Sequence, residues 1–104
     1  MADLRVSQIK IRVGSAGSCI GTFYNNGVAN IMIIDSVIVE VKSRGKGVGR
    51  ALMEKALSIA RERNVDSIEL VVNSDNTIAK RLYKKVGFSK TNKEYYRLIL
   101  NKKQ

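Results

Sequence analysis

Residues 31–63 read IMIIDSVIVEVKSRGKGVGRALMEKALSIARER, and this stretch decides the fold. An apolar run, Ile31–Val41, leads into a loop containing Gly45, Gly47 and Gly49, and a helical pattern follows at once. Glycine permits positive φ and leaves room for a ligand beside the backbone. Successive N–H groups can then converge on an anion at the positive end of a helix dipole. The loop therefore predicts a phosphate-binding turn, and the alternative is a flexible turn without a ligand.

Length and composition predict one domain over residues 1–104, long enough for a core of its own. No apolar run could cross a bilayer, and the N-terminus lacks the pattern of a secretory signal. Cys19 is the sole cysteine and histidine is absent, which excludes an internal disulfide and disfavours a structural zinc site. We therefore expect a cytoplasmic protein that uses no metal.

The formal net charge is +10, and residues 80–104 carry nine Lys or Arg beside one acid, Glu94. Such a field attracts nucleic acid, acidic proteins or phosphorylated small ligands. Aromatic residues are sparse, and neither an RNA-recognition signature nor zinc-finger spacing is present. Charge alone names no partner, and nucleic acid is disfavoured.

The chain before the glycine loop has the pattern of strands joined by tight turns. The third run, Ile31–Val41, is apolar on both faces, as expected of a central strand covered on both sides. Asp35-Ser36 interrupts this run and predicts a bulge. The two earlier strands are expected at residues 4–13 and 18–24, and the turns that follow them at residues 14–17 and 25–27.

The second half of the chain alternates helical and strand patterns. Apolar residues at helical spacing predict helices that end at Asn64 and Gly87, the second one capped by Ser74 and Asp75. A strand between two such helices favours a parallel, right-handed crossover with the central strand. The expected helices are residues 47–63 and 76–86, the strand is 67–73, and a final hairpin joins 88–90 to 95–100.

These elements predict an α/β (α+β) domain with a mixed, mostly antiparallel sheet of about six strands, a central parallel pair and two main helices. Two other phosphate-binding motifs do not fit. A P-loop needs a Gly-Lys-Ser/Thr end at fixed spacing, and a dinucleotide fingerprint needs a third glycine where Arg50 or Leu52 stands.

Two motifs resemble signatures of the GNAT superfamily of N-acetyltransferases. Arg44-x-x-Gly47-x-Gly49, after an apolar strand, looks like that family's acetyl-CoA pyrophosphate motif. A downstream motif is similar to the second signature: Asn76-x-x-Ala79-x-x-Leu82-Tyr83-x-x-x-Gly87-Phe88. The two occur in the family's order and at its separation, and the resemblance spans roughly residues 16–100. It implies a GNAT-like fold in which the central parallel pair splays apart.

The resemblance implies a binding site for acetyl-CoA as acyl donor. Loop amides and two arginines would hold the pyrophosphate, the splayed strand would pair with the pantetheine arm, and Asn76 would hydrogen-bond that arm. The implied cofactor-binding residues are Val37, Val39, Val41, Arg44, Gly45, Lys46, Gly47, Val48, Gly49, Arg50 and Asn76.

The resemblance also implies that Tyr83 protonates the departing thiolate while an amine attacks the thioester directly. A phenol pKa near 10 suits that step, and with no histidine and with Cys19 remote in sequence Tyr83 is the best donor. Packing on the apolar stripe of its helix is the alternative role for Tyr83.

The general base departs from the family pattern. Carboxylates that serve as base in some relatives correspond to Ile33 and Val71, which cannot act. Asp35 and Glu69 lie two residues away on the same nominal faces and are the candidate bases, with a structural or surface role as the alternative. Water could also take the amine proton.

Members of this family usually begin with a strand and two helices, and the loop between these helices forms one wall of the acceptor pocket. This chain is expected to begin at the family's second strand and so to be a form truncated at its N-terminus. An uncovered sheet edge and an apolar face favour self-association, so a homodimer with clefts near the interface is expected. The leading function is acetyl-CoA-dependent transfer to a primary amine. A non-catalytic acyl-CoA-binding module and a basic nucleic-acid-binding protein are the alternatives.

Overall fold

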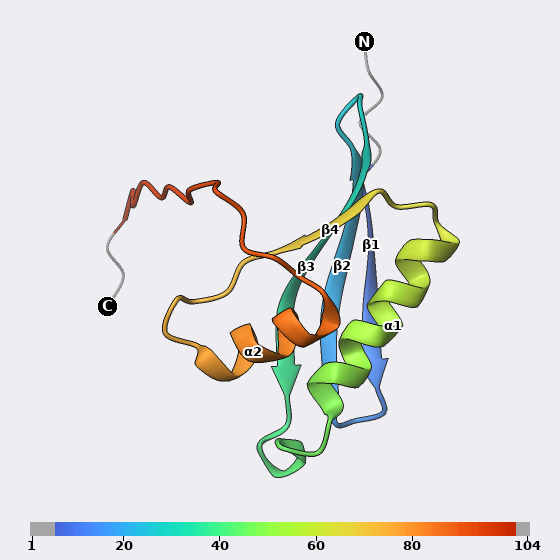
Figure 1. Ribbon diagram of the computed structural model, residues 1–104, viewed down its shortest axis with the longest axis vertical. Coiled ribbons are helices and arrows are strands. Elements are labelled where there is room, and N and C mark those ends of the chain that lie inside the picture. Colours follow the sequence, from blue (N-terminus) through green and yellow to red (C-terminus); the bar gives the residue numbers. More distant parts are fainter. Residues whose placement is uncertain (1–5, 102–104) are drawn as a thin grey trace.

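Four strands and two α-helices make up residues 6–101, the part of the chain that the computed structural model describes (Figure 1). Leu4 and Arg5 of the first expected strand lie outside this range. In chain order the elements are β1 (Ser7–Val13), β2 (Gly17–Asn25), β3 (Asn30–Val39), the 3-10 helix η1 (Val41–Ser43), α1 (Val48–Glu62), β4 (Ser67–Leu70) and α2 (Thr77–Val86).

The first three strands form an antiparallel meander, as the turn signals predicted. Gly14 takes φ 52° between β1 and β2, and Gly27 takes φ 90° between β2 and β3. The Asn26 side-chain oxygen accepts hydrogen bonds from the amides of residues 28 and 29 at 2.9 and 2.8 Å. Both turns therefore use residues that tolerate or stabilise left-handed backbone.

A bulge divides β3 into two halves. Ile20 of β2 lies opposite Asp35, whereas Ser18 lies opposite Ile38, so β3 has one extra residue here and two of its residues lie opposite Cys19. Ser36 within this bulge has φ 53°, a left-handed conformation that is uncommon for serine. The predicted break at Asp35-Ser36 is confirmed.

The parallel pair predicted across α1 is also confirmed. Residues Ile31 to Ile34 of β3 pair with Ser67 to Leu70 of β4. Beyond Leu70 the chain leaves the sheet, while β3 continues to Val39, so the two strands separate. The expected strand over 67–73 is therefore shorter than predicted, because its last three residues diverge from their partner.

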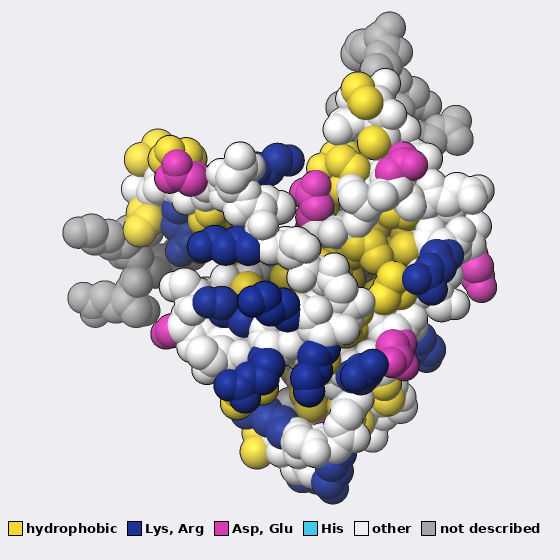
Figure 2. Space-filling model, in the orientation of Figure 1, with side chains coloured by type: hydrophobic (Ala, Val, Ile, Leu, Met, Phe, Trp, Pro, Cys, Tyr) yellow, Lys and Arg dark blue, Asp and Glu magenta, His cyan; other side chains and the backbone are white. Residues whose placement is uncertain are grey.

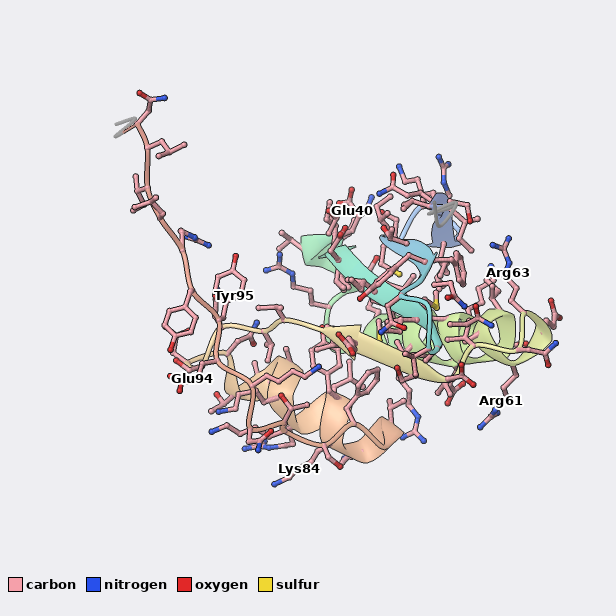
Figure 3. The ribbon with its side chains drawn as sticks, turned by 90° about the horizontal axis from the view of Figure 1, so that it is seen from above. Glu40, Arg61, Arg63, Lys84, Glu94 and Tyr95 are labelled. Atoms are coloured by element: carbon pink, nitrogen blue, oxygen red, sulfur yellow. The ribbon has the colours of Figure 1, made fainter. Side chains whose placement is uncertain are left out.

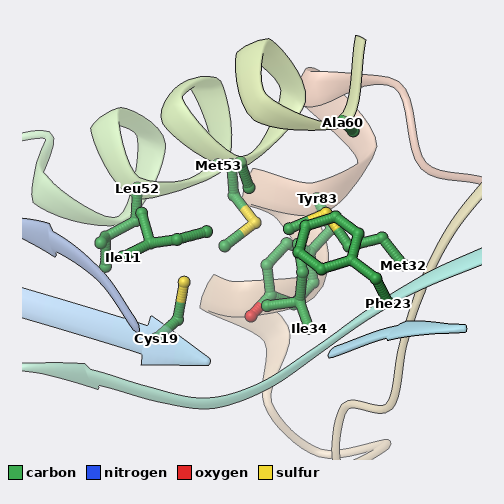
Figure 4. Packing of buried hydrophobic residues seen from close by; sticks show 10 residues of the cluster. Ile11, Cys19, Phe23, Met32, Ile34, Leu52, Met53, Ala60 and Tyr83 are labelled. Atoms are coloured by element: carbon green, nitrogen blue, oxygen red, sulfur yellow. The ribbon is translucent and has the colours of Figure 1, made fainter. Parts of the chain in front are cut away.

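Both helices lie on one face of the sheet (Figure 3). Leu52 and Met53 of α1 are fully buried against Cys19 and Met32 of the strands, and Tyr83 of α2 joins the same cluster (Figure 4). Burying each large apolar side chain contributes about 1.5–3 kcal/mol. No helix within the described range is long and apolar enough to span a membrane.

The start of α2 differs from the expected cap. Asn76, rather than Ser74 or Asp75, is the N-cap residue, and its Oδ1 accepts a hydrogen bond from the Ala79 amide at 3.1 Å. The helix begins one residue later than predicted, which moves the capping position onto Asn76. Gly87 ends the helix at φ 123°, as predicted.

Two sheet predictions are wrong within the described residues. The sheet has four strands rather than about six, because residues 88–90 and 95–100 form no hairpin. The Ile31–Val41 run is not covered on both sides: Val37 and Ile38 are 38% and 62% exposed, and the helices occupy one face only. Apolar composition indicated strand and burial, but pairing and coverage depend on which distant segments come to lie alongside.

Candidate functional site

The second half of β3 presents main-chain groups along an open edge. The Glu40 amide donates to Ala16 O at 2.8 Å, on the β2 side. Main-chain groups alternate along a strand, so those of Val37 and Val39 face the opposite side, where β4 has diverged. Val41 lies in η1, where its carbonyl accepts the Arg44 amide at 3.3 Å. The structure thus places Val37 and Val39 on the open edge and Val41 at its end.

Arg44 links the glycine loop to this edge, a contact that sequence reasoning missed. Its Nε donates to Val39 O at 3.2 Å. The guanidinium is therefore held against the open edge of β3, where it engages one of the main-chain acceptors. No signal in the sequence predicted this contact, because it depends on how η1 turns the chain back.

The glycine loop leads directly into the N-terminus of α1. Gly45 and Gly47 have φ of 76° and 82°, and a Cβ on either would meet nothing within 4 Å. Glycine is therefore needed at these two positions for its backbone conformation, and the space beside the backbone is open. Gly49 differs, because its Cβ would lie 3.0 Å from Leu82 Cδ2, so it allows α2 to approach α1 closely.

The first amides of α1 are placed to bind an anion. The first main-chain bond of the helix runs from Ala51 N to Gly47 O at 3.0 Å, so the amides of residues 48–50 precede the intrahelical ladder. The N-cap, Gly47, has no side chain to cap them, and no acid occupies the first turn. These amides stand at the positive end of the helix dipole beside a loop that lacks side-chain bulk.

Basic side chains surround this anion-binding arrangement. Arg50 pairs with Glu54 at 3.0 Å, and both side chains are more than half exposed. Figure 2 shows Lys and Arg side chains gathered over α2 and extending toward the glycine loop. The exposed basic residues of α2 are Lys80, Arg81, Lys84 and Lys85. The surface therefore favours a ligand with several negative charges.

Tyr83 lies at the inner side of α2, 9% exposed, in the core cluster that includes Ile34, the last β3 residue paired with β4 (Figure 4). Its ring meets Phe88 edge-on, with 5.8 Å between ring centroids. Burial, and to a smaller extent the nearby Cys19, raises the pKa of the Tyr83 phenol. Tyr83 therefore keeps its proton at neutral pH and can act as a donor.

Cys19 is adjacent to the candidate donor in space although it is distant in sequence. It is fully buried opposite the bulge, and burial followed by the charge of Asp35 raises the pKa of its thiol. This supports the reading of Cys19 as a small buried hydrophobe. Its charge is the smaller of the two causes that raise the pKa of the Tyr83 phenol, after burial.

Asp35 and Glu69 lie on the sheet face opposite the helices. Ile34 and Leu70 pack in or against the core on the helix side, so the neighbouring Asp35 and Glu69 point the other way. Glu69 sits opposite Ile33 in the parallel pair. The structure places these two acids on one face of the sheet and Tyr83 on the other. The gap between β3 and β4 begins beside them, beyond Ile34 and Leu70.

A third acid, Glu40 at the end of β3, was not singled out from the sequence. It is exposed just after β3 and borders a hollow of about 200 Å³ that Lys10, Arg12 and Ser18 also line. Figure 3 shows Glu40 on the side of the sheet away from the helices. The local signal was weak, because a single acid after a strand usually marks solvent exposure.

Comparisons with known proteins match the part of the chain that contains the glycine loop and both helices. The sequence profile of the acetyltransferase (GNAT) family matches residues 13–88. A mycothiol acetyltransferase from Beutenbergia cavernae is 43% identical over 51 residues, which is 49% of this chain and 17% of that protein. The peptidyl-lysine N-acetyltransferase YjaB from Escherichia coli is 43% identical over 58 residues, 56% of this chain and 36% of that protein. The chain therefore spans well under half the length of these relatives.

Solved structures agree on the fold. An integron cassette protein from Vibrio cholerae superposes with a TM-score of 0.76 at 29% identity, covering 92% of this chain and 62% of that one. A putative acetyltransferase from Agrobacterium tumefaciens gives a TM-score of 0.79 at 15% identity, covering 88% and 69% of the two chains. The profile match runs from the end of β1 to Phe88 and includes the glycine loop and both helices. This chain belongs to the acetyltransferase (GNAT) family.

Proposed function

We propose that this protein transfers the acetyl group of acetyl-CoA directly to a primary amine of an acceptor. The observation that carries the proposal is the placement of two features side by side: the α1 amides behind the glycine loop, and the open edge of β3. One suits a diphosphate and the other suits an extended, amide-containing arm. Family membership supports the same ligand.

The diphosphate is held by the amides of residues 44–50, with charge from Arg44, Lys46 and Arg50. The positive φ of Gly45 and Gly47 orients these amides, and Gly49 lets α2 close against α1. Arg50 shares its charge with Glu54, so the main chain supplies most of the anion binding. Val48 contributes through its amide at the first helical position.

The pantetheine arm lies along β3 as an added strand, hydrogen-bonded to Val37, Val39 and Val41. Arg44 already donates to Val39 O, which keeps a second lone pair for the arm, and the same contact holds the guanidinium next to the glycine loop that binds the diphosphate. The Asn76 oxygen is engaged in capping α2, so its NH₂ group is the part that donates to the arm.

Acyl transfer then needs one proton donor and one proton acceptor. When bound, acetyl-CoA supplies an activated thioester. The amine nitrogen attacks the carbonyl carbon, the C–N bond forms, the C–S bond breaks, and Tyr83 gives its phenolic proton to sulfur. The raised pKa of Tyr83 supports this role, since the phenol remains protonated until that step.

The amine proton leaves toward the opposite face, where Asp35 and Glu69 are the candidate bases. Their location supports an acceptor that approaches from the face without helices. The candidate bases thus lie on the acceptor side of the sheet, and the protonated phenol of Tyr83 lies on the opposite side. Water replaces the carboxylate if the amine arrives neutral.

We also propose a cytoplasmic location and a homodimer with its clefts near the interface. The single buried cysteine supports a reducing compartment. The exposed apolar residues Val37, Ile38 and Val41 beside the splay support a partner surface near the site.

Burial of Tyr83 favours one alternative, a non-catalytic acyl-CoA-binding module in which this residue only packs. Two measurements separate the functions: calorimetric titration with acetyl-CoA, and CoA release with a panel of amines. For the transferase, Tyr83→Phe is expected to keep cofactor affinity and lower turnover by about 10²–10⁴-fold. Tyr24→Phe, at a half-buried tyrosine of β2, is the matched control. Cofactor binding without CoA release for any amine would leave the binding module, and full turnover by Tyr83→Phe would remove the assigned donor.

A further inference from the structure

The face of the sheet without helices carries opposite charges at its two sides. Ile11 packs in the core, so Lys10 and Arg12, its neighbours on β1, point to the helix-free face. Asp35 and Glu69, the candidate bases, point to the same face from β3 and β4. The strand order β1-β2-β3-β4 therefore places the two cations on the β1 side of this face and the two acids on the β3–β4 side.

Strand register sets the distance between these charges. Lys10 lies opposite Ile20, and Ile20 lies opposite Asp35, so the three residues form one row across the sheet. Neighbouring strands are about 4.8 Å apart, which puts the Cα atoms of Lys10 and Asp35 about 10 Å from each other. Among residues 6–101 the only ion pair is Arg50–Glu54, so the opposite charges of this face do not neutralise one another. The residue between them, Ile20, is apolar and half-buried.

A hollow of about 200 Å³ is lined by both cations of β1. Its wall also includes Ser18 of β2, which lies opposite Arg12 on one side and opposite Ile38 on the other. Lysine, arginine and serine together offer several hydrogen-bond donors to one carboxylate. Glu40 also borders the hollow, so two cations and one acid leave its lining with a net charge of +1. That charge suits a carboxylate better than a doubly charged phosphate.

We infer that the acceptor is a peptide-like amine that carries a carboxylate about 10 Å from the amine, a distance spanned by about three extended residues. The hollow holds the carboxylate, and Ile20 and Ile38 contact the apolar body of the acceptor. The amine reaches Asp35 and Glu69, beside the separation of β3 and β4. The fate of the amine rests on the proposed acetyl transfer, whereas the binding of the carboxylate does not.

The carboxylate site is separate from the anion-binding loop before α1. Residues 44–50 of that loop do not line the hollow, which is built from β1, from the turn between β1 and β2, and from the end of β3. A diphosphate cofactor and a carboxylate-bearing acceptor therefore use different cations and can be bound at the same time.

The tripeptide Ala-Leu-Ala and its C-terminal amide form a matched pair of probes, because they differ only in the carboxylate. Both are titrated into the isotope-labelled full chain without acetyl-CoA. The acid is expected to shift the amide resonances of residues 10–18 and to bind about fivefold more tightly than the amide, as an exposed ion pair allows. Equal affinities for the two peptides, or shifts confined to other parts of the chain, would overturn the inference.

Charge-removing variants locate the preference. Lys10→Gln and Arg12→Gln each remove one cation from an exposed position, and each should reduce the preference for the acid to about twofold or less. Lys93→Gln, the same change in the chain that follows α2, is the matched control and should keep the full preference. A preference that falls equally in all three variants would reflect the net charge of +10, and the assignment of the hollow would be wrong.

Turnover separates this inference from the transferase proposal. With acetyl-CoA present, the acid should have the lower KM and the two peptides should have similar kcat, because the hollow positions the acceptor without touching the reacting atoms. Tighter binding of the acid without any CoA release would support the carboxylate site and remove the transferase. CoA release with equal KM for the two peptides would support the transferase and remove the carboxylate site.

Discussion

The two halves of β3 have different partners and different surroundings. Ile31–Ile34 pairs with β2 on one side and β4 on the other, and Met32 and Ile34 are 0% and 2% exposed. In the second half, Ile38 and Val39 pair with β2 alone, and the other edge is open. The bulge at Ser36 separates the halves. One strand therefore anchors the core with its first half and has an open main-chain edge along its second.

Truncating the paired half should have the largest effect on stability. Met32→Ala removes a fully buried side chain and leaves a cavity, which is expected to cost about 2–5 kcal/mol of unfolding free energy. Val37→Ala in the splayed half should cost about 0.5 kcal/mol or less, because that side chain is partly exposed. Urea denaturation measures both. Equal costs would show that the two halves do not differ in this way.

The glycine loop sharpens the comparison from the ligand side. Gly47→Ala is expected to cost about 1–2 kcal/mol, since its left-handed backbone penalises a Cβ even though the space is open. Gly14→Ala at φ 52°, with equally open space, should cost a similar amount. Only Gly47→Ala should also weaken acetyl-CoA binding in calorimetry, by roughly tenfold or more. Equal losses of acetyl-CoA affinity in both variants would show that the glycine loop does not bind this ligand.

Alkaline pH tests whether burial raises the pKa of Tyr83. Burial raises the pKa of Tyr83 in the folded state, so the unfolded phenol ionises first as pH rises. Its contribution to stability is thus complete below the ordinary tyrosine range and is lost as pH rises through and beyond it. The melting temperatures of wild type and Tyr83→Phe should depend on pH in the same way near neutrality. At alkaline pH the melting temperature of the wild type should fall more steeply. Parallel curves would contradict the shift.

The smallest expected effect concerns the ion pair near the loop. Arg50→Ala removes the contact with Glu54, and because both side chains are largely exposed the stability loss is about 0.3–0.5 kcal/mol. Glu54→Ala should cost no more, yet it frees Arg50 and should leave or improve acetyl-CoA affinity. If Glu54→Ala weakened binding as much as Arg50→Ala, the arginine charge would not be acting on the ligand.

Elements with local causes were predictable from sequence. Gly27 and Asn26 specify the hairpin through turn chemistry, Asn64 and Gly87 end the helices, and Asp35-Ser36 marks the bulge. The parallel pairing of β3 with β4 also followed, because a helix between two strands leaves few connections.

Elements with distant causes were not. Residues 95–100 have strand composition but no strand partner in the described chain, and the Arg44 contact with Val39 depends on the path of η1. Cys19 was set aside as remote in sequence, yet folding brings it beside Tyr83. In each case the deciding contact joins segments that no local pattern relates.

By itself the sequence determined the helices, the turns, the bulge and a loop suited to an anion, because each depends on backbone preferences and periodicity within a few residues. Only the tertiary structure decided where β3 and β4 separate, which face the helices cover and which acids lie opposite Tyr83. Those outcomes depend on packing between distant segments, in which burial of one surface leaves another open.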